Sequence, residues 1–183
     1  IEVFMKELKW TGHYHKREDG IGENVHWMPY HKKEPTPYYK TSTSFTLTKT
    51  IEYDNMDVLR EHADNLERLQ NEKFTLFHVP EFEFVVCENY LQYTCQFIKG
   101  KRAKPERVQH LYNEIVLRDS EYSFCDYNLD NFIRVYQGDL GSTKEYQGAV
   151  YSIDLTSYRR MPVEQRKQLW IRQKEKWNRW LPP

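Results

Sequence analysis

Two carboxylates and one amide in the last third of the chain have the types and spacing that phosphoryl transfer requires. Asp126 precedes Asn131 by five residues within the segment 124–133 (FCDYNLDNFI), and Asp154 ends a later apolar run. Such a reaction needs a carboxylate that accepts the proton of the attacking hydroxyl, and nearby oxygens that coordinate Mg²⁺ without adding excess charge. The pattern therefore predicts Asp126 as the base, with Asn131 and Asp154 as metal ligands.

A β-hairpin is expected to place these residues. The runs 132–136 and 149–155 are rich in β-branched and apolar residues, and Gly138, Gly141 and Gly148 lie in the connection between them. The shorter segment 123–129 leads into the first run. The hairpin would then join the part of the chain that contains Asn131 to the part that contains Asp154.

The remaining elements follow from hydrophobic periodicity. An N-cap at Asp54-Asn55 and leucines at helical spacing predict one helix, and a stripe of tryptophans predicts another at the C-terminus, with its Trp face packed in the core. The predicted strands cover 38–51, 74–86 and 90–98, and the predicted helices cover 56–73, 105–118 and the chain from Pro162 onward. This alternation indicates an α+β fold.

Composition restricts the class of protein. The 183 residues contain 27 Lys and Arg against 27 Asp and Glu, which argues against wrapping of nucleic acid. The chain is 39% hydrophobic and 15% aromatic, as expected for a compact domain and not for a disordered one. No run approaches the ~18 apolar residues of a membrane span. Three cysteines without a C-x-x-C pair favour a reducing, cytoplasmic location.

The order of Asp126, Asn131, hairpin and Asp154 resembles the protein-kinase-like superfamily. The catalytic loop of that family reads H-R-D-L-x-x-x-N, with the same offset of five between Asp and Asn. The apolar residues directly after the Asn look more like aminoglycoside, choline and lipopolysaccharide kinases than like typical Ser/Thr kinases. The resemblance implies that 154–156 (DLT) stands where the family has D-F-G.

The resemblance also assigns residues in the N-terminal half. Lys49, in the run 45–49 (FTLTK), would contact the nucleotide phosphates, and Leu47 on the same strand face would cover the adenine. The following helix would supply a glutamate partner for the lysine. Glu67, at the edge of the apolar stripe, is the choice, and Glu61 is the alternative.

Residues 96–100 (QFIKG) resemble the linker between kinase lobes, whose backbone groups pair with adenine. Gln96 and Ile98 would then bind the nucleotide. The implied architecture is a minimal bilobal kinase-like fold, with a β-rich N-lobe over 1–98 and a truncated C-lobe over 99–183.

Three departures from the family pattern point to a reduced kinase. Phe-Cys (124–125) replaces the His-Arg that precedes the catalytic Asp. The best candidate for a phosphate-covering loop, 19–25 (DGIGENV), has its second glycine, Gly22, 27 residues before Lys49 (49 − 22). Only 29 residues (183 − 154) follow Asp154, too few for a lobe that binds a peptide.

The sequence therefore predicts a phosphotransferase that uses ATP and Mg²⁺ and modifies an unidentified hydroxyl-bearing substrate. One alternative is a pseudokinase or interaction module. Its acidic block (52–88, ten acidic minus three basic gives −7) or its basic block (159–179, eight basic minus two acidic gives +6) would dock a protein partner, unless both are simply solvated faces. Another alternative is a small RNA-binding protein that uses the basic, Trp-bearing C-terminal helix.

Two further clusters have both a functional and a structural interpretation. The basic residues of 99–107 would grip a phosphorylated or acidic substrate, or would form a solvated linker. His13 and His15 would ligate a metal only if a third ligand met them, and alternate histidines in an exposed strand are more often surface residues.

Overall fold

The computed structural model describes residues 24–29, 37–42, 46–98, 100–135 and 149–180. Within them the protein is α+β, as predicted, with three antiparallel sheets and four α-helices. The chain divides into two compact units, the first formed by 1–64 and 81–97 and the second by 65–80 and 98–183. No helix of the described residues is long and apolar enough to cross a membrane.

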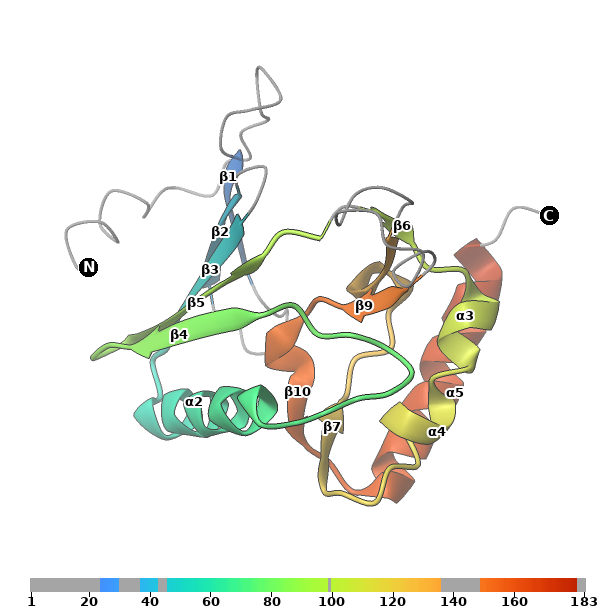
Figure 1. The fold of residues 1–183 in the computed structure, drawn as a ribbon. Coiled ribbons are helices and arrows are strands. Elements are labelled where there is room, and N and C mark those ends of the chain that lie inside the picture. The colour runs from blue at the N-terminus through green and yellow to red at the C-terminus, as the bar shows by residue number, and fades with distance from the viewer. Residues whose placement is uncertain (1–23, 30–36, 43–45, 99, 136–148, 181–183) are drawn as a thin grey trace. The chain divides into compact units, whose positions relative to one another are not determined.

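The first unit contains a five-stranded antiparallel sheet (Figure 1). Residues 38–51, predicted as β-structure, supply two of its strands, and β3 and β5 pair from Thr46↔Gln96 to Glu52↔Tyr90. β3 therefore lies inside the sheet, with β2 on one side and β5 on the other. In spatial order the strands are β1 (Asn24–Pro29), β2 (Pro37–Ser42), β3 (Thr46–Glu52), β5 (Tyr90–Gln96) and β4 (Phe82–Val86).

Helix α2 (Met56–Gln70) confirms the helix predicted over 56–73, although it ends three residues earlier. Asn55 caps it, because its Oδ1 accepts hydrogen bonds from the backbone N–H groups of Asp57 (2.9 Å) and Val58 (3.4 Å). The leucines whose spacing predicted the helix, Leu59, Leu66 and Leu69, are all buried.

The strand predicted over 74–86 is wrong in its first half, since β4 covers only the last five residues. The preceding backbone finds its partners within the second unit. The N–H groups of residues 75–76 donate to the Glu114 carboxylate at 2.7 and 3.1 Å, and His78 N donates to Val150 O at 2.8 Å. A proline that lacks an N–H then ends this stretch.

The second unit contains two small sheets, β6-β8-β9 and β7-β10, together with three α-helices that lie wholly within it. The predicted hairpin is confirmed, because β8 and β9 pair antiparallel, with Phe132 opposite Ser152. The elements, in chain order, are β6 (Gly100–Arg102), α3 (Pro105–Gln109), α4 (Tyr112–Ile115), β7 (Tyr122–Phe124), β8 (Phe132–Val135), β9 (Val150–Ser152), β10 (Tyr158–Arg160) and α5 (Val163–Trp180).

The single helix predicted over 105–118 is wrong, because the chain forms the two short helices α3 and α4 instead. Between them Leu111 N donates to Val108 O at 2.9 Å, a tighter three-residue turn that interrupts the α-helical bonding. Most of the apolar stripe that predicted this helix is nevertheless buried. Tyr112 is half-buried, and the other four residues are at most 2% exposed: Val108, Leu111, Ile115 and Val116.

Helix α5 packs Trp170 and Trp177 into the core of the second unit, as predicted. Trp170 and Trp177 are 5% and 3% exposed, with ring centroids 5.1 Å apart. Trp170 also meets Tyr112 of α4 edge to face, and α5 lies alongside α3 and α4 (Figure 1). Arg166 of the predicted basic block is fully buried, and its Nη2 donates to Arg118 O at 3.0 Å.

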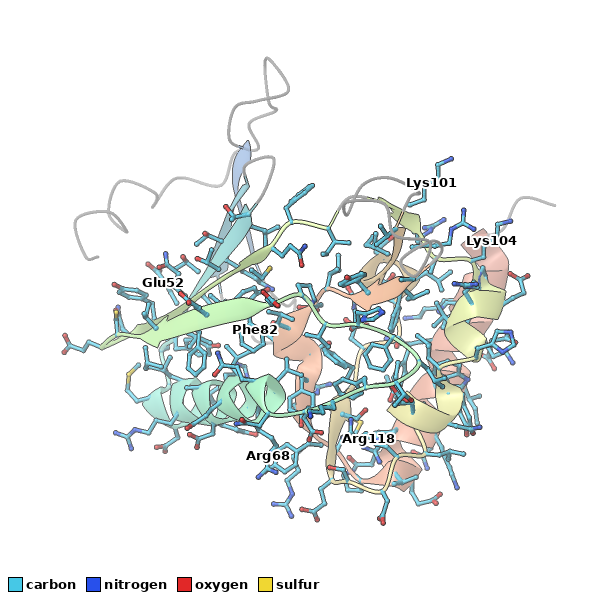
Figure 2. All side chains as sticks on the ribbon, viewed as in Figure 1. Glu52, Arg68, Phe82, Lys101, Lys104 and Arg118 are labelled. Atoms are coloured by element: carbon cyan, nitrogen blue, oxygen red, sulfur yellow. The ribbon has the colours of Figure 1, made fainter. Side chains whose placement is uncertain are left out.

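A partly buried polar cluster connects residues 65–80 to the rest of the second unit. Arg118 Nη2 donates to Glu72 Oε2 at 2.7 Å, and the Tyr158 hydroxyl donates to Glu72 Oε1 at 2.8 Å. The guanidinium of Arg118, labelled in Figure 2, also lies 4.7 Å from the centre of the Phe74 ring. The Glu72 carboxylate, just after the end of α2, therefore bonds both to the segment that follows α4 and to β10.

Candidate active site

Asp126 lies in the turn after β7, and its carboxylate has two donors. Its Oδ1 accepts hydrogen bonds from Asn128 N at 3.1 Å and from Gln173 Nε2 of α5 at 3.3 Å. The bond from Asn128 closes an Asx turn, the local structure that an aspartate favours at such a position. The side chain is half-buried, so the carboxylate is oriented by the fold and still partly accessible.

Asn131 connects the neighbourhood of Asp126 to that of Asp154. Its Nδ2 donates to Asp126 O at 3.4 Å, and Ile153 N donates to Asn131 O at 3.0 Å. Since the amide nitrogen is engaged in this way, Oδ1 is the atom of Asn131 that a metal ion would bind. Two hydrogen bonds thus join Asn131 to Asp126 and to Ile153, the residue before Asp154.

Asp154 precedes a 3₁₀-helix (Leu155–Ser157) directly after the β8–β9 hairpin. Its Oδ1 accepts from Thr156 Oγ1 at 3.2 Å, and its carbonyl oxygen accepts from Ser157 Oγ at 2.7 Å. The described residues contain no cluster of three His, Cys, Asp or Glu side chains. A metal site here would therefore combine the Asp154 carboxylate with an amide oxygen, and hard oxygen ligands of this kind suit Mg²⁺.

Helix α5 holds the Asp126 loop through two residues that the sequence interpretation did not assign. Gln173 Oε1 accepts from Tyr127 N at 2.5 Å, and Trp177 Nε1 donates to Tyr127 O at 2.9 Å. Helix α5 thus forms hydrogen bonds with both the backbone N–H and the carbonyl of Tyr127, the residue after Asp126. A signal was present, because Gln173 lies three residues after Trp170 and four before Trp177, on the face that the tryptophans define.

The residues assigned to the nucleotide in the N-terminal half lie on paired strands of the first unit. Lys49 is in β3 and only 4% exposed, which is unusual for a lysine. Leu47 lies two residues earlier on the same strand face, and is half-buried. Gln96 is the last residue of β5. These three belong to the first unit, whereas Asp126 and its partners belong to the second.

The other assigned residues have more varied surroundings. Glu67 and Glu61 are both exposed on α2, whereas Asn65 of the same helix is 5% exposed. Ile98 is half-buried and is the residue at which the chain enters the second unit for the second time. The candidate phosphate loop up to residue 23, together with His13, His15 and Lys99, lies outside the described residues.

Burial dominates the electrostatics of the loop that contains Asp126. It raises the pKa of the Cys125 thiol above its usual range, while the cations Arg159 and Arg166 act in the opposite direction. Burial likewise raises the pKa of Tyr127, whose hydroxyl has no hydrogen-bond partner among the described residues. At Tyr158 burial again raises the pKa, and the hydrogen bond to Glu72 adds to the effect.

Stability is therefore expected to fall at alkaline pH, because the unfolded chain ionises these groups before the folded one does. A raised pKa of an acid contributes stability that is present below the unfolded pKa and is lost as the pH rises from the unfolded pKa through the folded one. We expect urea denaturation to show a lower free energy of unfolding at about pH 10.5 than at about pH 8. Tyr127→Phe should be neutral or stabilising by about 1 kcal/mol at the lower pH, because it removes an unpaired hydroxyl. It should also reduce the alkaline loss, and an unchanged loss would contradict this assignment.

Comparison with known proteins assigns no family. No model of a protein family matches the chain, and neither a curated protein nor a solved structure matches it.

Proposed function

We propose that the protein is an ATP-dependent phosphotransferase with a reduced kinase-like fold. The observation that supports this most is the pair of bonds around Asn131: its Nδ2 reaches the carbonyl of Asp126, and its carbonyl accepts from the residue before Asp154. An acid, an amide and a second acid, connected in this order, are the groups that a phosphotransferase uses as base and metal ligands.

The order of elements along the N-terminal half of the chain also supports the proposal. In protein kinases the phosphate-binding lysine lies on the third strand, and a helix with a glutamate follows it. Here Lys49 is in β3, and α2 follows before β4 and β5. In this proposal Lys49 neutralises the phosphates, Leu47 covers the adenine, and the backbone of Gln96 pairs with the base. The roles of Glu67 and Ile98, which belong to the second unit, stay predictions from the sequence.

The proposed chemistry consists of positioning and electrostatic stabilisation. Asp126, oriented by Asn128 N and Gln173 Nε2, accepts the proton of the attacking hydroxyl. Asn131 and Asp154 hold Mg²⁺, which when bound bridges phosphate oxygens and offsets their charge.

Binding of Mg-ATP tests the proposal directly. We expect Mg-ATP to raise the melting temperature of the protein, since a ligand at 100 times its Kd stabilises the folded state by about 2.7 kcal/mol. Asp154→Asn should lose this rise, because it removes the negative charge that holds the metal while keeping the oxygen that accepts from Thr156.

Asp119→Asn is the matched control, because Asp119 is an exposed aspartate of the same unit, and its Mg-ATP shift should equal that of the wild type. No shift of the wild type at millimolar Mg-ATP would refute the phosphotransferase. A shift that survives in Asp154→Asn would refute the assigned metal ligand.

An interaction module is the second candidate, and the exposed edge of the first unit's sheet favours it. β4 is an edge strand, and its Val85 and Val86 are 38% and 47% exposed. Exposed apolar residues on an edge strand are typical of a surface that pairs with another chain. Absence of any Mg-ATP shift in the experiment above would favour this function.

A further inference from the structure

A small pocket of about 240 Å³ lies within the second unit beside the Asp126 loop. The loop contributes Asn128, Leu129 and Asp130 to its wall. Its volume is below the range of about 300–1,000 Å³ that drug-sized ligands occupy, so the pocket suits a small molecule and not a peptide.

The charges of the pocket favour an anion. Arg102 of β6 and Lys176 of α5 line it together with one carboxylate, Asp130, which leaves a net charge of +1 (two cations minus one anion). Arg102 Nη1 lies 3.3 Å from Asp130 Oδ1, and both side chains are largely exposed, so this pair is weak. Lys101 and Lys104 extend into solvent from the same stretch of chain (Figure 2).

The hydrogen-bonding groups of the pocket also favour an anion. Gln173, also in the wall, uses its Oε1 for Tyr127 N and its Nε2 for Asp126. Asn128 uses its Oδ1 to accept from Asp130 N at 3.0 Å, so its Nδ2 remains as a donor toward a ligand. What the polar wall offers to a ligand is therefore mainly N–H donors.

The apolar side of the pocket consists of Leu129 and Trp177. The indole Nε1 of Trp177 already donates to Tyr127 O, so the indole offers its ring and not its N–H to a ligand. A short carbon skeleton with an anionic end would match this combination of an apolar wall and cationic donors.

We propose that this pocket binds the phosphate or carboxylate group of a small hydroxyl-bearing acceptor, an inference that rests on the proposed phosphotransferase function. The wall residue Gln173 donates to the Asp126 carboxylate at 3.3 Å, so a ligand held here is one side chain away from the proposed base. Arg102 and Lys176 bind the anionic end. The hydrogen bonds of Gln173 with Tyr127 and Asp126 keep its side-chain amide in place.

The test uses three probes that share a three-carbon skeleton with hydroxyl groups: glycerol 3-phosphate, glycerate and glycerol. The signal is the ¹H–¹⁵N resonance of the Trp177 indole in the 183-residue protein, and this signal does not depend on turnover. We expect glycerol 3-phosphate or glycerate to shift this resonance, with the tighter of the two identifying the anionic group, and glycerol to leave it in place.

Substitutions of single lysines and arginines provide the matched comparison. Arg102→Gln and Lys176→Gln should each weaken binding of the anionic probe by roughly tenfold, as expected for loss of one charge-assisted hydrogen bond. Lys174→Gln removes the same charge from an exposed position of α5 outside the pocket and should change little. Melting temperatures close to that of the wild type would show that all three variants fold.

Two results would refute binding in this pocket. One is no shift of the Trp177 resonance with either anion, and the other is a Lys174→Gln variant that weakens anion binding as much as Arg102→Gln and Lys176→Gln do. A shift with glycerol equal to that of the anions would overturn the choice of an anionic ligand. Failure of the proposed function gives a different result: Mg-ATP does not stabilise the wild type, although the anion still shifts the Trp177 resonance.

Discussion

Asp126→Asn should lower the rate of phosphoryl transfer by about 10²–10⁴-fold, the usual contribution of a general base. The amide cannot accept the proton of the attacking hydroxyl. It does keep an oxygen at Oδ1, so the bonds from Asn128 N and Gln173 Nε2 are retained and the loop stays folded. The rate is measured as ADP released from Mg-ATP, with glycerol 3-phosphate or glycerate as acceptor.

The affinity for Mg-ATP separates this effect from loss of the nucleotide site. Asp126→Asn should bind Mg-ATP as tightly as the wild type, and the exposed Asp119→Asn should retain both binding and ADP release. Equal ADP release from Asp126→Asn and the wild type would exclude Asp126 as the base. Loss of nucleotide binding in Asp126→Asn would instead indicate that the residue holds the metal.

Trp170→Ala should destabilise the second unit by about 3–5 kcal/mol, the range for truncating a buried aromatic residue. Trp170 is 5% exposed, and its ring lies 5.1 Å from the rings of Tyr112, Tyr127 and Trp177. The substitution therefore removes three aromatic contacts along with the buried area. Because domains are stable by only about 5–15 kcal/mol, a large part of the unit's stability would be lost.

The adjacent residue of the same helix provides the control. Ile171 is 60% exposed, so Ile171→Ala should change the free energy of unfolding by less than about 0.5 kcal/mol. Urea denaturation followed by far-UV circular dichroism gives the midpoints, and hydrogen exchange of the α5 amides reports on the second unit by itself. Similar midpoints for the two variants would contradict the role of α5 as the core helix.

Elements with a strong local signal were predicted well. The start of α2 follows from Asn55, whose side chain caps the first turn in any context that lets the helix form. The C-terminal helix follows from the spacing of Trp170 and Trp177, because burial of one face requires that period. The hairpin of β8 and β9 follows from two β-rich runs separated by glycines.

Elements that depend on distant partners were predicted poorly. β10 is three residues long with two arginines, and it is a strand only because Tyr158–Arg160 pairs with β7. Residues 75–78 have a strand-like composition, yet their backbone bonds to Glu114 and to β9 keep them outside the sheet of the first unit. Neither pairing can be predicted from the local sequence, because nearly every residue type has the same backbone N–H and C=O groups.

The candidate site shows the same division. The sequence by itself determined which residue types stand in which order: an acid, an amide five residues later and a second acid after a hairpin. Only the tertiary structure decided how these residues are held, through Asn131 and through Gln173 and Trp177 of α5. The physical reason is that spacing along the chain fixes local geometry, whereas the orientation of Asp126 depends on contacts with a helix almost 50 residues away.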